Sequence, residues 1–363
     1  MKVYDRLDRQ YEMFAEEYKQ AAMRVLDSGW YILGRECESF EQEFASYIGG
    51  DSYCVGLNSG LDALILAVRA LGIGAGDEVI VPANTYIATV LGITENGAVP
   101  VFVEPDEYYN IDAGKIEAAI TGRTKAIIVV HLYGQAANMK RIKDIADRYG
   151  LKLIEDCAQS HTAEFDGKAT GTWGDVGCFS FYPTKNLGAF GDGGAVLVRD
   201  KDLAAKFRAL RNYGSSVKYH NDYCGVNSRL DEMQAALLRV KLSHLAELIA
   251  ERKKLKEIYL SGIKHKDIIL PAVRDGAGHV WHLFVIRTER RNELHDYLEA
   301  KGIHTQIHYP IPPHMQKCYE YLGHHKGELP IAEKYADEVL SLPFYNGMTE
   351  EEINCVIEAV NEF

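Results

Sequence analysis

From residue 53 onwards, short runs rich in β-branched residues alternate with longer segments of helical spacing, such as 138–149. This alternation predicts an α/β fold with a mostly parallel sheet flanked by helices. The predicted strands are 77–81, 98–103, 126–130 and 151–156. Ligands of such sheets collect beyond the carboxyl ends of the strands, where the sequence places 82–86, 131–135 and Asp156.

The chain after Arg229 has a different pattern. A long charged segment, 230–259, carries apolar residues at helical spacing, which predicts a connecting helix. Its apolar stripe favours core packing, with a subunit interface as the alternative. A predicted strand and two predicted helices follow, at 280–286, 291–301 and 333–341. Because 363 residues exceed the size of one core, we predict a large domain, 1–248, and a smaller C-terminal α/β domain, 249–363.

Composition argues against several classes of partner. The 40 basic and 52 acidic residues give a formal net charge of −12 with no basic stripe, so we expect no nucleic acid. The sequence has no apolar run of about 18 residues, and its charged segment 1–18 lacks a signal-peptide core, so we expect no membrane and a cytoplasmic location. The seven scattered cysteines contain no Cys-x-x-Cys motif, and we expect neither disulfides nor a metal.

One lysine is distinguished by its surroundings. Lys185 follows an aromatic run and precedes a glycine-rich turn within 180–195, and the strand predicted to end at Asp156 lies upstream. A lysine amine forms a Schiff base with the aldehyde of pyridoxal 5'-phosphate, and a carboxylate beside the ring nitrogen keeps the ring protonated. Lys185 and Asp156 are therefore candidate catalytic residues for this cofactor. The alternative is that Lys185 is a solvated loop residue.

Such a cofactor also needs a phosphate site. Small residues at 56–60 precede a predicted helix, 61–71, whose free N–H groups and dipole favour a phosphate. Alternatively, Asn58 or Ser59 is only the N-cap of that helix. Ser180, at the end of the aromatic run, could add a hydroxyl to the same phosphate.

Two further side chains fit the cofactor ring. Tyr86 follows a predicted strand and could stack on the pyridine, although it also fits a core or rim position. Gln159, three residues after Asp156, could reach the ring hydroxyl or could be a surface amide. With the phosphate site, these residues would supply all the contacts that the cofactor needs.

These motifs occur in an order that resembles a known family, the DegT/DnrJ/EryC1/StrS sugar aminotransferases, and the likeness covers nearly the whole chain. The resemblance implies the aspartate aminotransferase fold, called fold type I of the pyridoxal phosphate enzymes. The matching segments are 29–34 (GWYILG), 58–64 (NSGLDAL), 82–89 (PANTYIAT), 131–135 (HLYGQ), 155–161 (EDCAQSH), 180–195, 227–231 (NSRLD) and 308–312 (HYPIP).

The resemblance implies roles for the residues around the ring. Lys185 would hold the cofactor and move protons, and Asp156 would pair with the pyridine nitrogen. Gln159 would contact the ring hydroxyl, and Tyr86 would stack on the ring. These are the positions that match the family motif, and they coincide with the candidates chosen from the residues alone.

The resemblance also implies a phosphate site and a dimer. The N–H groups of Gly60 and Leu61 and the hydroxyl of Ser180 would bind the phosphate. Asn227 would reach the phosphate of the neighbouring subunit, so a homodimer with active sites at the interface is expected. Leu61 departs from the threonine of many members, and because this position acts through its N–H group we expect little loss.

The reaction that the resemblance implies has two halves. L-Glutamate would leave its amine on the cofactor, and a nucleotide-linked ketosugar would take it up, with Lys185 as the acid–base group in both. The sequences of segments 180–188 and 131–135 resemble those of family members that aminate the sugar at carbon 3. A dTDP-linked 3-keto-6-deoxyhexose is therefore expected, giving a dTDP-3-amino-3,6-dideoxyhexose of gluco or galacto form for a surface glycan or a natural product.

Four residues are candidate substrate contacts, each with a structural role as the alternative: Tyr182, Arg229, His308 and Tyr309. The segment 211–220 is predicted to be a mobile loop that could add positive charge. The rival functions are the same chemistry on a UDP-linked 3-keto-hexuronic acid or on a 4-keto sugar, and a non-catalytic regulatory protein that binds the cofactor. A third rival, thiol chemistry of fold type I, would depend on Cys224.

Overall fold

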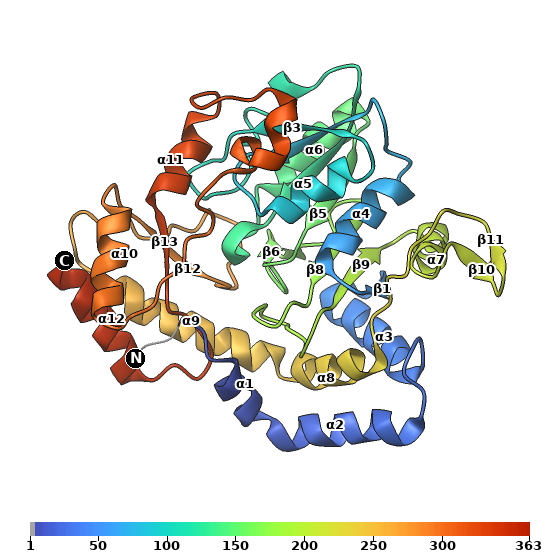
Figure 1. The fold of residues 1–363 in the computed structure, drawn as a ribbon, viewed down its shortest axis with the longest axis horizontal. Helices are drawn as coiled ribbons and strands as arrows, with labels where there is room; N and C mark the ends of the chain where they lie inside the picture. Colours follow the sequence, from blue (N-terminus) through green and yellow to red (C-terminus); the bar gives the residue numbers. More distant parts are fainter. Residues whose placement is uncertain (1–3) are drawn as a thin grey trace.

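A computed structural model describes residues 4–363. A central sheet with helices on both faces forms one part of the molecule, and a smaller group of helices and two strands forms another (Figure 1). The long helix α9 (Leu245–Gly262) runs between the two parts. The α/β class and the mostly parallel sheet predicted from the sequence are confirmed.

The sheet has seven strands in the order β1-β9-β8-β5-β4-β2-β3. Every strand except β9 runs in the same direction, because β9 pairs antiparallel with both β8 and β1. The strands are β1 (Tyr53–Leu57), β2 (Glu78–Pro82), β3 (Val99–Val103), β4 (Thr124–Val130), β5 (Lys152–Asp156), β8 (Val176–Ser180) and β9 (Gly194–Val198). The four strands predicted from β-branched runs correspond to β2, β3, β4 and β5 within two residues.

Side-chain alternation along the strands divides the core between the two faces of the sheet. In β2, Val79 and Val81 pack with residues of α4 and α5, whereas Ile80 packs with residues of α6. Phe179 of β8 joins α3 and α8 in a third cluster. The helices concerned are α3 (Arg35–Gly49), α4 (Gly60–Ala70), α5 (Ile87–Thr94), α6 (Met139–Tyr149), α7 (Lys201–Leu210) and α8 (Glu232–Ser243).

The segment predicted as one helix over 230–259 is two helices, α8 and α9, so that prediction is wrong in its continuity. The break falls at His244, whose ring stacks on Phe14 with centroids 3.8 Å apart. Phe14 separates α1 (Leu7–Met13) from α2 (Ala15–Ser28), and α2 packs along α8. Most of the apolar stripe is buried in these cores, and Met233 and Val240 are half-buried against them, which is the core packing that the pattern favours.

The C-terminal part has its own core around a two-stranded antiparallel sheet of β12 (Phe284–Arg287) and β13 (Val339–Leu342). Helices α10 (Arg291–Ala300), α11 (Pro330–Glu338) and α12 (Glu350–Glu362) accompany it. The helix predicted over 333–341 is wrong beyond Glu338, because 339–342 pairs with β12 and is buried throughout. Residues of α9 belong to both cores, and the domain boundary after residue 248 stays a prediction.

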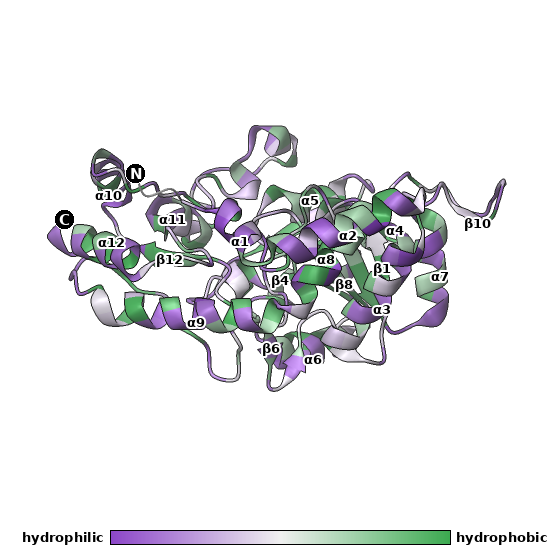
Figure 2. Ribbon diagram, turned by 90° about the horizontal axis from the view of Figure 1, so that it is seen from below, coloured by the Kyte–Doolittle hydropathy of each residue, from purple (hydrophilic) through white to green (hydrophobic). Residues whose placement is uncertain are grey.

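Short elements complete the fold. The segment predicted as a mobile loop contains a hairpin of β10 (Ser215–Val217) and β11 (His220–Asn221), which projects from the body of the molecule (Figures 1 and 2). Strands β6 (Glu164–Phe165) and β7 (Lys168–Ala169) form another hairpin, and single 3₁₀ turns occupy Glu117–Ala119, Leu132–Gly134, Pro313–Met315 and Lys317–Leu322. Among residues 4–363, every helix is too short or too polar to cross a bilayer.

Candidate active site

A cleft of about 920 Å³ opens at the carboxyl ends of the parallel strands, between the sheet and the C-terminal part. It is lined by most of the predicted site residues: Gly60, Leu61, Tyr86, Asp156, Gln159, Ser180, Tyr182, Lys185, His308 and Tyr309. These side chains come from segments spread over about 250 positions of the chain. The topology of the sheet therefore collects in one cavity what the sequence presents as separate motifs.

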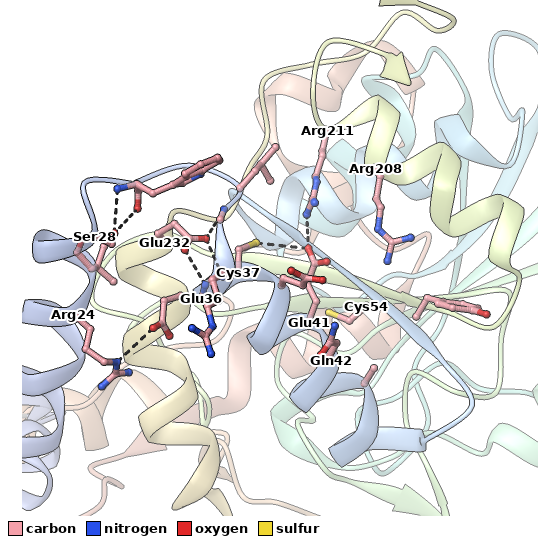
Figure 3. Close-up of a pocket in the computed structure, with 18 of the residues that line it drawn as sticks. Arg24, Ser28, Glu36, Cys37, Glu41, Gln42, Cys54, Arg208, Arg211 and Glu232 are labelled. Atoms are coloured by element: carbon pink, nitrogen blue, oxygen red, sulfur yellow. Dashed lines mark hydrogen bonds and ion pairs between the residues drawn. The ribbon is translucent and has the colours of Figure 1, made fainter. Parts of the chain in front are cut away.

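A larger groove of about 1220 Å³ lies elsewhere, against α2, α3 and α8 (Figure 3). It contains none of the predicted site residues, and several of its charged side chains are paired within it. Glu232 accepts hydrogen bonds from the backbone N–H groups of Gly34, Glu36 and Cys37 at the start of α3, and Arg211 pairs with Glu41. These contacts hold α3 in place, so we locate the chemistry in the first cleft.

Lys185 and Asp156 face the same cleft and affect one another electrostatically. Burial lowers the pKa of Lys185 from 10.5 to about 8, with the carboxylate of Asp156 opposing that change. Asp156 ends β5 and is buried, and its oxygens accept hydrogen bonds from Thr89 Oγ1 at 2.9 Å and from the N–H group of Ala158 at 3.1 Å. Burial raises the pKa of Asp156, against those two hydrogen bonds and the lysine. The pair provides a readily deprotonated amine opposite a fixed carboxyl group.

The start of α4 forms a cradle for an anion. Ser59 is the N-cap and accepts from the N–H group of Asp62, which leaves the N–H groups of Gly60 and Leu61 without an acceptor within residues 4–363. A Cβ at Gly60 would lie 2.6 Å from the Cβ of Ser180 and 3.2 Å from its hydroxyl oxygen, so glycine is required for this close approach. Two N–H groups and one hydroxyl therefore converge at a helix N-terminus, an arrangement that binds phosphate.

Gln159 connects the two sides of the cleft. Its Oε1 accepts from the N–H group of Tyr133 at 2.6 Å, and its Nε2 donates to the hydroxyl of Tyr309 at 3.1 Å. The Tyr309 ring lies 5.2 Å from the ring of Tyr86, which is 54% exposed to the cleft. The ring contacts assigned to Gln159 and Tyr86 stay predictions.

His308 is held on three sides. Its Nδ1 lies 2.8 Å from Ser341 Oγ, its carbonyl accepts a hydrogen bond from the Tyr133 hydroxyl, and its ring lies 6.0 Å from that of Tyr4. Burial and the charge of Lys185 lower the pKa of His308 to about 4, so the imidazole is neutral at pH 7. Because Nδ1 is engaged with Ser341, Nε2 is the nitrogen left for a substrate.

Two predicted site residues do not line this cleft. Arg229 donates to Asn212 Oδ1 at 2.9 Å and lies over the ring of Tyr213, and Asn227 is exposed in the segment before it. Neither is among the residues that line the cavity of its own chain. The substrate contact of Arg229 and the reach of Asn227 into a neighbouring subunit stay predictions.

Other residues of the cleft were not singled out from the sequence. Tyr4, Arg252 and His282 line the cavity but belong to segments without a motif. Thr89 of α5 belongs to the matched segment 82–89 but has no signal of its own in the sequence, and its hydroxyl lies 2.8 Å from that of Thr85 in the turn before the helix. The cleft thus has contributions that only the tertiary structure reveals.

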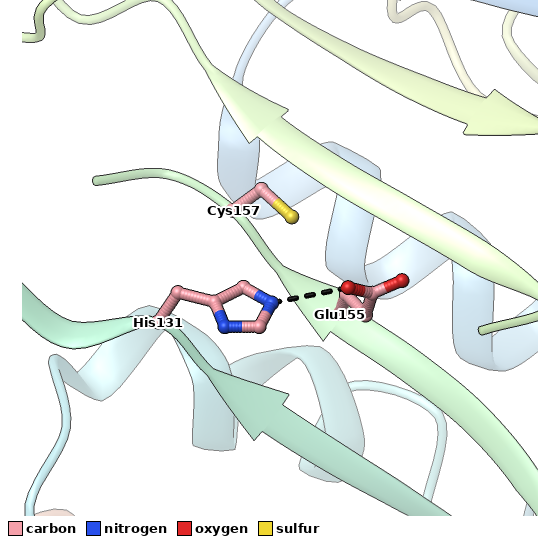
Figure 4. A group of neighbouring side chains, drawn as sticks. All are labelled: His131, Glu155 and Cys157. Atoms are coloured by element: carbon pink, nitrogen blue, oxygen red, sulfur yellow. Dashed lines mark hydrogen bonds and ion pairs between the residues drawn. The ribbon is translucent and has the colours of Figure 1, made fainter. Parts of the chain in front are cut away.

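Behind Asp156, three buried side chains, His131, Glu155 and Cys157, lie close together (Figure 4). His131 Nδ1 accepts from the N–H group of Ala137, so its Nε2 carries the hydrogen and donates to Glu155 at 3.1 Å. Glu155 also accepts from the N–H groups of Gly171, Trp173 and Gly174, and burial raises the pKa of the Cys157 thiol. These hydrogen bonds fix the turn behind the site and account for the cluster.

The features of the cleft fit pyridoxal phosphate. An amine of lowered pKa suits attack on an aldehyde, and a buried carboxylate suits a protonated ring nitrogen. The N–H groups of Gly60 and Leu61 beside the hydroxyl of Ser180 suit a phosphate. The residues of the cleft therefore offer a chemically suitable partner to the aldehyde, the ring nitrogen and the phosphate of the cofactor.

Comparison with known proteins places the chain in a family. Residues 12–361 match the DegT/DnrJ/EryC1/StrS aminotransferase family. The chain is 54% identical over 351 residues, 96% of each chain, to dTDP-3-amino-3,6-dideoxy-alpha-D-galactopyranose transaminase of Aneurinibacillus thermoaerophilus. A crystal structure of S. venezuelae DesV in complex with a ketimine intermediate is 49% identical and superposes with a TM-score of 0.97, over 99% of this chain and 98% of that one.

NtdA of Bacillus subtilis, solved with its bound cofactor PMP, is 33% identical, with a TM-score of 0.92 over 100% of this chain and 86% of that one. The resemblance drawn from the motifs, and fold type I with it, is confirmed by these findings. The chain therefore belongs to the DegT/DnrJ/EryC1/StrS aminotransferase family.

Proposed function

We propose that the protein transfers an amino group from L-glutamate to carbon 3 of a dTDP-linked 3-keto-6-deoxyhexose, giving a dTDP-3-amino-3,6-dideoxyhexose. The observation that carries the proposal is Lys185, whose pKa is lowered to about 8, in one cleft with the buried Asp156 and a phosphate cradle. The sugar follows from a relative that is 54% identical and is named as a dTDP-3-amino-3,6-dideoxy-alpha-D-galactopyranose transaminase.

Pyridoxal phosphate is the cofactor, and when bound it accepts the amine from the donor and delivers it to the ketone. Lys185 would hold it and then move protons at the reacting carbon, because an amine with a pKa of about 8 both accepts and donates near neutral pH. Asp156, fixed by Thr89 and Ala158, would face the ring nitrogen. Gly60, Leu61 and Ser180 would bind the phosphate.

The substrate side is assigned in the same way. Tyr182, His308 and Tyr309 line the cleft and would contact the sugar, His308 through its neutral Nε2. Arg229 and Asn227 lie outside the cleft of their own chain, which supports their acting in that of a second copy. We therefore propose a cytoplasmic homodimer whose active sites lie at the interface.

The test is an absorption spectrum of the purified protein with its cofactor, recorded before and after L-glutamate and then after the ketosugar. Glutamate should convert the cofactor band, and the dTDP-3-keto-6-deoxyhexose should restore it. Lys185→Ala should show neither change. Restoration only by a UDP-3-keto-hexuronic acid or a 4-keto sugar would replace the proposed substrate. A wild-type band that glutamate leaves unchanged would favour a regulatory protein.

A further inference from the structure

The two ring nitrogens of His308 have different surroundings. Nδ1 lies 2.8 Å from Ser341 Oγ, whereas Nε2 has no hydrogen-bond partner within residues 4–363 and is not fully enclosed by the protein. Burial and the charge of Lys185 lower the pKa of His308 to about 4, so near neutral pH the two nitrogens share a single hydrogen. The partner of Nδ1 therefore decides whether Nε2 offers the cleft a hydrogen-bond donor or an acceptor.

Ser341, the partner of Nδ1, is fully buried in β13. Its backbone N–H group and carbonyl are both bonded to Gln306, at 2.7 and 3.2 Å, which fixes the place of its side chain. Among residues 4–363, His308 Nδ1 is the one acceptor within 3.5 Å and in hydrogen-bonding geometry for the Ser341 hydroxyl. A buried hydroxyl hydrogen without an acceptor is costly, so Ser341 donates to Nδ1.

Tyr4 favours the same direction of donation. Its ring lies 6.0 Å from that of His308, burial raises its pKa and keeps its hydroxyl protonated, and this hydroxyl hydrogen-bonds with Ser341. A phenol is a stronger acid than an alcohol, and an imidazole nitrogen is a stronger base than a phenol oxygen. The favoured order of donation is therefore from Tyr4 to Ser341 and from Ser341 to His308, which leaves the hydrogen of the imidazole on Nε2.

A second imidazole of the cleft, that of His282, is held in the opposite state. The amide nitrogen of Asn186 donates to the carbonyl of Val280 at 3.0 Å, so Asn186 Oδ1 is the atom that faces His282 Nδ1, at 3.3 Å. An amide oxygen only accepts, and Nδ1 of His282 must therefore carry the hydrogen. Burial lowers the pKa of His282, so this ring is neutral too. The two histidines that line the cleft thus differ in which nitrogen is protonated.

We infer that Ser341 and Tyr4 hold His308 in the tautomer with hydrogen on Nε2, and that this N–H group binds an acceptor oxygen of the sugar, an inference that rests on the sugar contact proposed for His308. Ser341 and Tyr4 are then positioning residues, because they act on the sugar through the imidazole. A ketone oxygen or the lone pair of a hydroxyl fits opposite Nε2. A protonated amine does not, because two donors would face one another.

The direct test is ¹⁵N NMR of the cofactor-loaded wild-type protein, labelled in its histidine rings and held near neutral pH. Protonated and unprotonated ring nitrogens give separate signals, and their couplings to the ring C–H groups distinguish Nδ1 from Nε2. The signals of His308 are those that His308→Gln removes or, should that variant not fold, those that Ser341→Ala shifts. We expect hydrogen on Nε2 of His308 and on Nδ1 of His282. Hydrogen on Nδ1 of His308 in the wild type would overturn the inference.

Three variants test the role of Ser341 in sugar binding. Ser341→Ala should spread the His308 hydrogen over both nitrogens and raise KM for the ketosugar about threefold to tenfold, with kcat and the affinity for pyridoxal phosphate kept within about twofold. Ser341→Thr keeps the hydroxyl and should restore both the tautomer and KM. Thr305→Val is the matched control, because the buried Thr305 Oγ1 lies 2.6 Å from His295 Nδ1 and neither residue lines the cleft.

The control should change the signals of His295 and leave KM for the ketosugar as in the wild type. An equal rise of KM in Thr305→Val would assign the effect to loosened packing, and an unchanged KM in Ser341→Ala would remove the contact with the sugar, so either result would overturn the inference. The proposed function would still stand if L-glutamate converts the wild type. A wild type that glutamate does not convert would remove that function, whatever the NMR shows of His308.

Discussion

The two walls of the cleft are built in different ways. The cofactor wall consists of Gly60, Asp156 and Ser180, each at the end of a strand or at the helix that follows one. The opposite wall combines Tyr4 of the N-terminal segment, Arg252 of α9 and His308 of the C-terminal part. The first wall is positioned by one sheet, whereas the second depends on how three distant segments dock.

Sheet register gives the cofactor wall its precision. Residue Asp156 pairs with Cys178 across β5 and β8, which places Ser180 two residues further along the neighbouring strand. A ladder of backbone hydrogen bonds fixes this spacing. Changes in this wall should therefore act on the cofactor, and changes in the opposite wall should act on substrates while the cofactor stays bound.

The largest expected effect is from Gly60→Ala, in the cofactor wall. The new Cβ would lie 2.6 Å from Ser180 Cβ and 3.1 Å from its Cα, so the cradle must open. Overpacking of this kind costs about 1–3 kcal/mol, which weakens cofactor binding on the order of 10–100-fold. The measurement is a titration of the cofactor-free protein with pyridoxal phosphate, followed by absorbance.

Gly122→Ala is the control for that substitution, because a Cβ at Gly122 meets no atom within 4 Å. It should bind the cofactor like the wild type. Equal affinities of the two variants for pyridoxal phosphate would show that the start of α4 is not the phosphate site. The assignment of Gly60 to a cofactor wall would then be wrong.

A smaller effect is expected in the opposite wall from Tyr133→Phe. The Tyr133 hydroxyl donates to the carbonyl of His308, and its loss should let His308 shift. One neutral hydrogen bond contributes about 1 kcal/mol, so we expect KM for the ketosugar to rise by roughly fivefold. The affinity for pyridoxal phosphate should not change, which separates the two walls in one experiment.

Tyr335→Phe is matched to Tyr133→Phe in chemistry. Its hydroxyl donates to the backbone carbonyl of Asp106 at 3.1 Å and, like that of Tyr133, joins the sheet part to the C-terminal part. Thermal unfolding should show similar losses of stability for the two variants. If Tyr335→Phe raises KM for the sugar as much as Tyr133→Phe does, the effect comes from loosened docking and not from the position of His308.

The difference between the walls also explains what the sequence could predict. Lys185, Asp156 and Ser180 were identified because strand ends and turn residues are local signals, and parallel strands bring their carboxyl ends together. Arg252 has no such signal, since it lies in a charged helix like many surface arginines and becomes exceptional only when three carbonyls close around it.

Two errors of secondary structure have the same origin. The helical spacing of apolar residues continues through His244, so the sequence predicts one helix. In the structure α8 and α9 are separated at His244, whose ring stacks on that of Phe14, 230 positions earlier in the chain. The apolar residues of 339–342 have no spacing that identifies a strand. The segment forms strand β13 because it pairs with β12. Local pattern fixes the elements that build the cofactor wall, and long-range docking decides those that build the opposite wall.

The smallest expected effect concerns the charge that links the two walls, that of Lys185. Its pKa is lowered to about 8, so the neutral amine that attacks the cofactor aldehyde forms as the pH rises through that value. Uptake of pyridoxal phosphate by the cofactor-free protein should accelerate with pH and level off above about 8. Stopped-flow absorbance across a pH series gives the midpoint.

Asp156→Asn should move that midpoint downward. The carboxylate stabilises the ammonium form of Lys185, so its removal lowers the lysine pKa further, and the neutral amine then persists to lower pH. Asp192→Asn is the control, because Asp192 lines the same cleft but is not among the charges that shift Lys185. An unchanged midpoint in Asp156→Asn would mean that the carboxyl group is already protonated in the cofactor-free protein, in line with the direction in which burial moves its pKa, and that Asp156 acquires its charge only by giving that proton to the ring nitrogen.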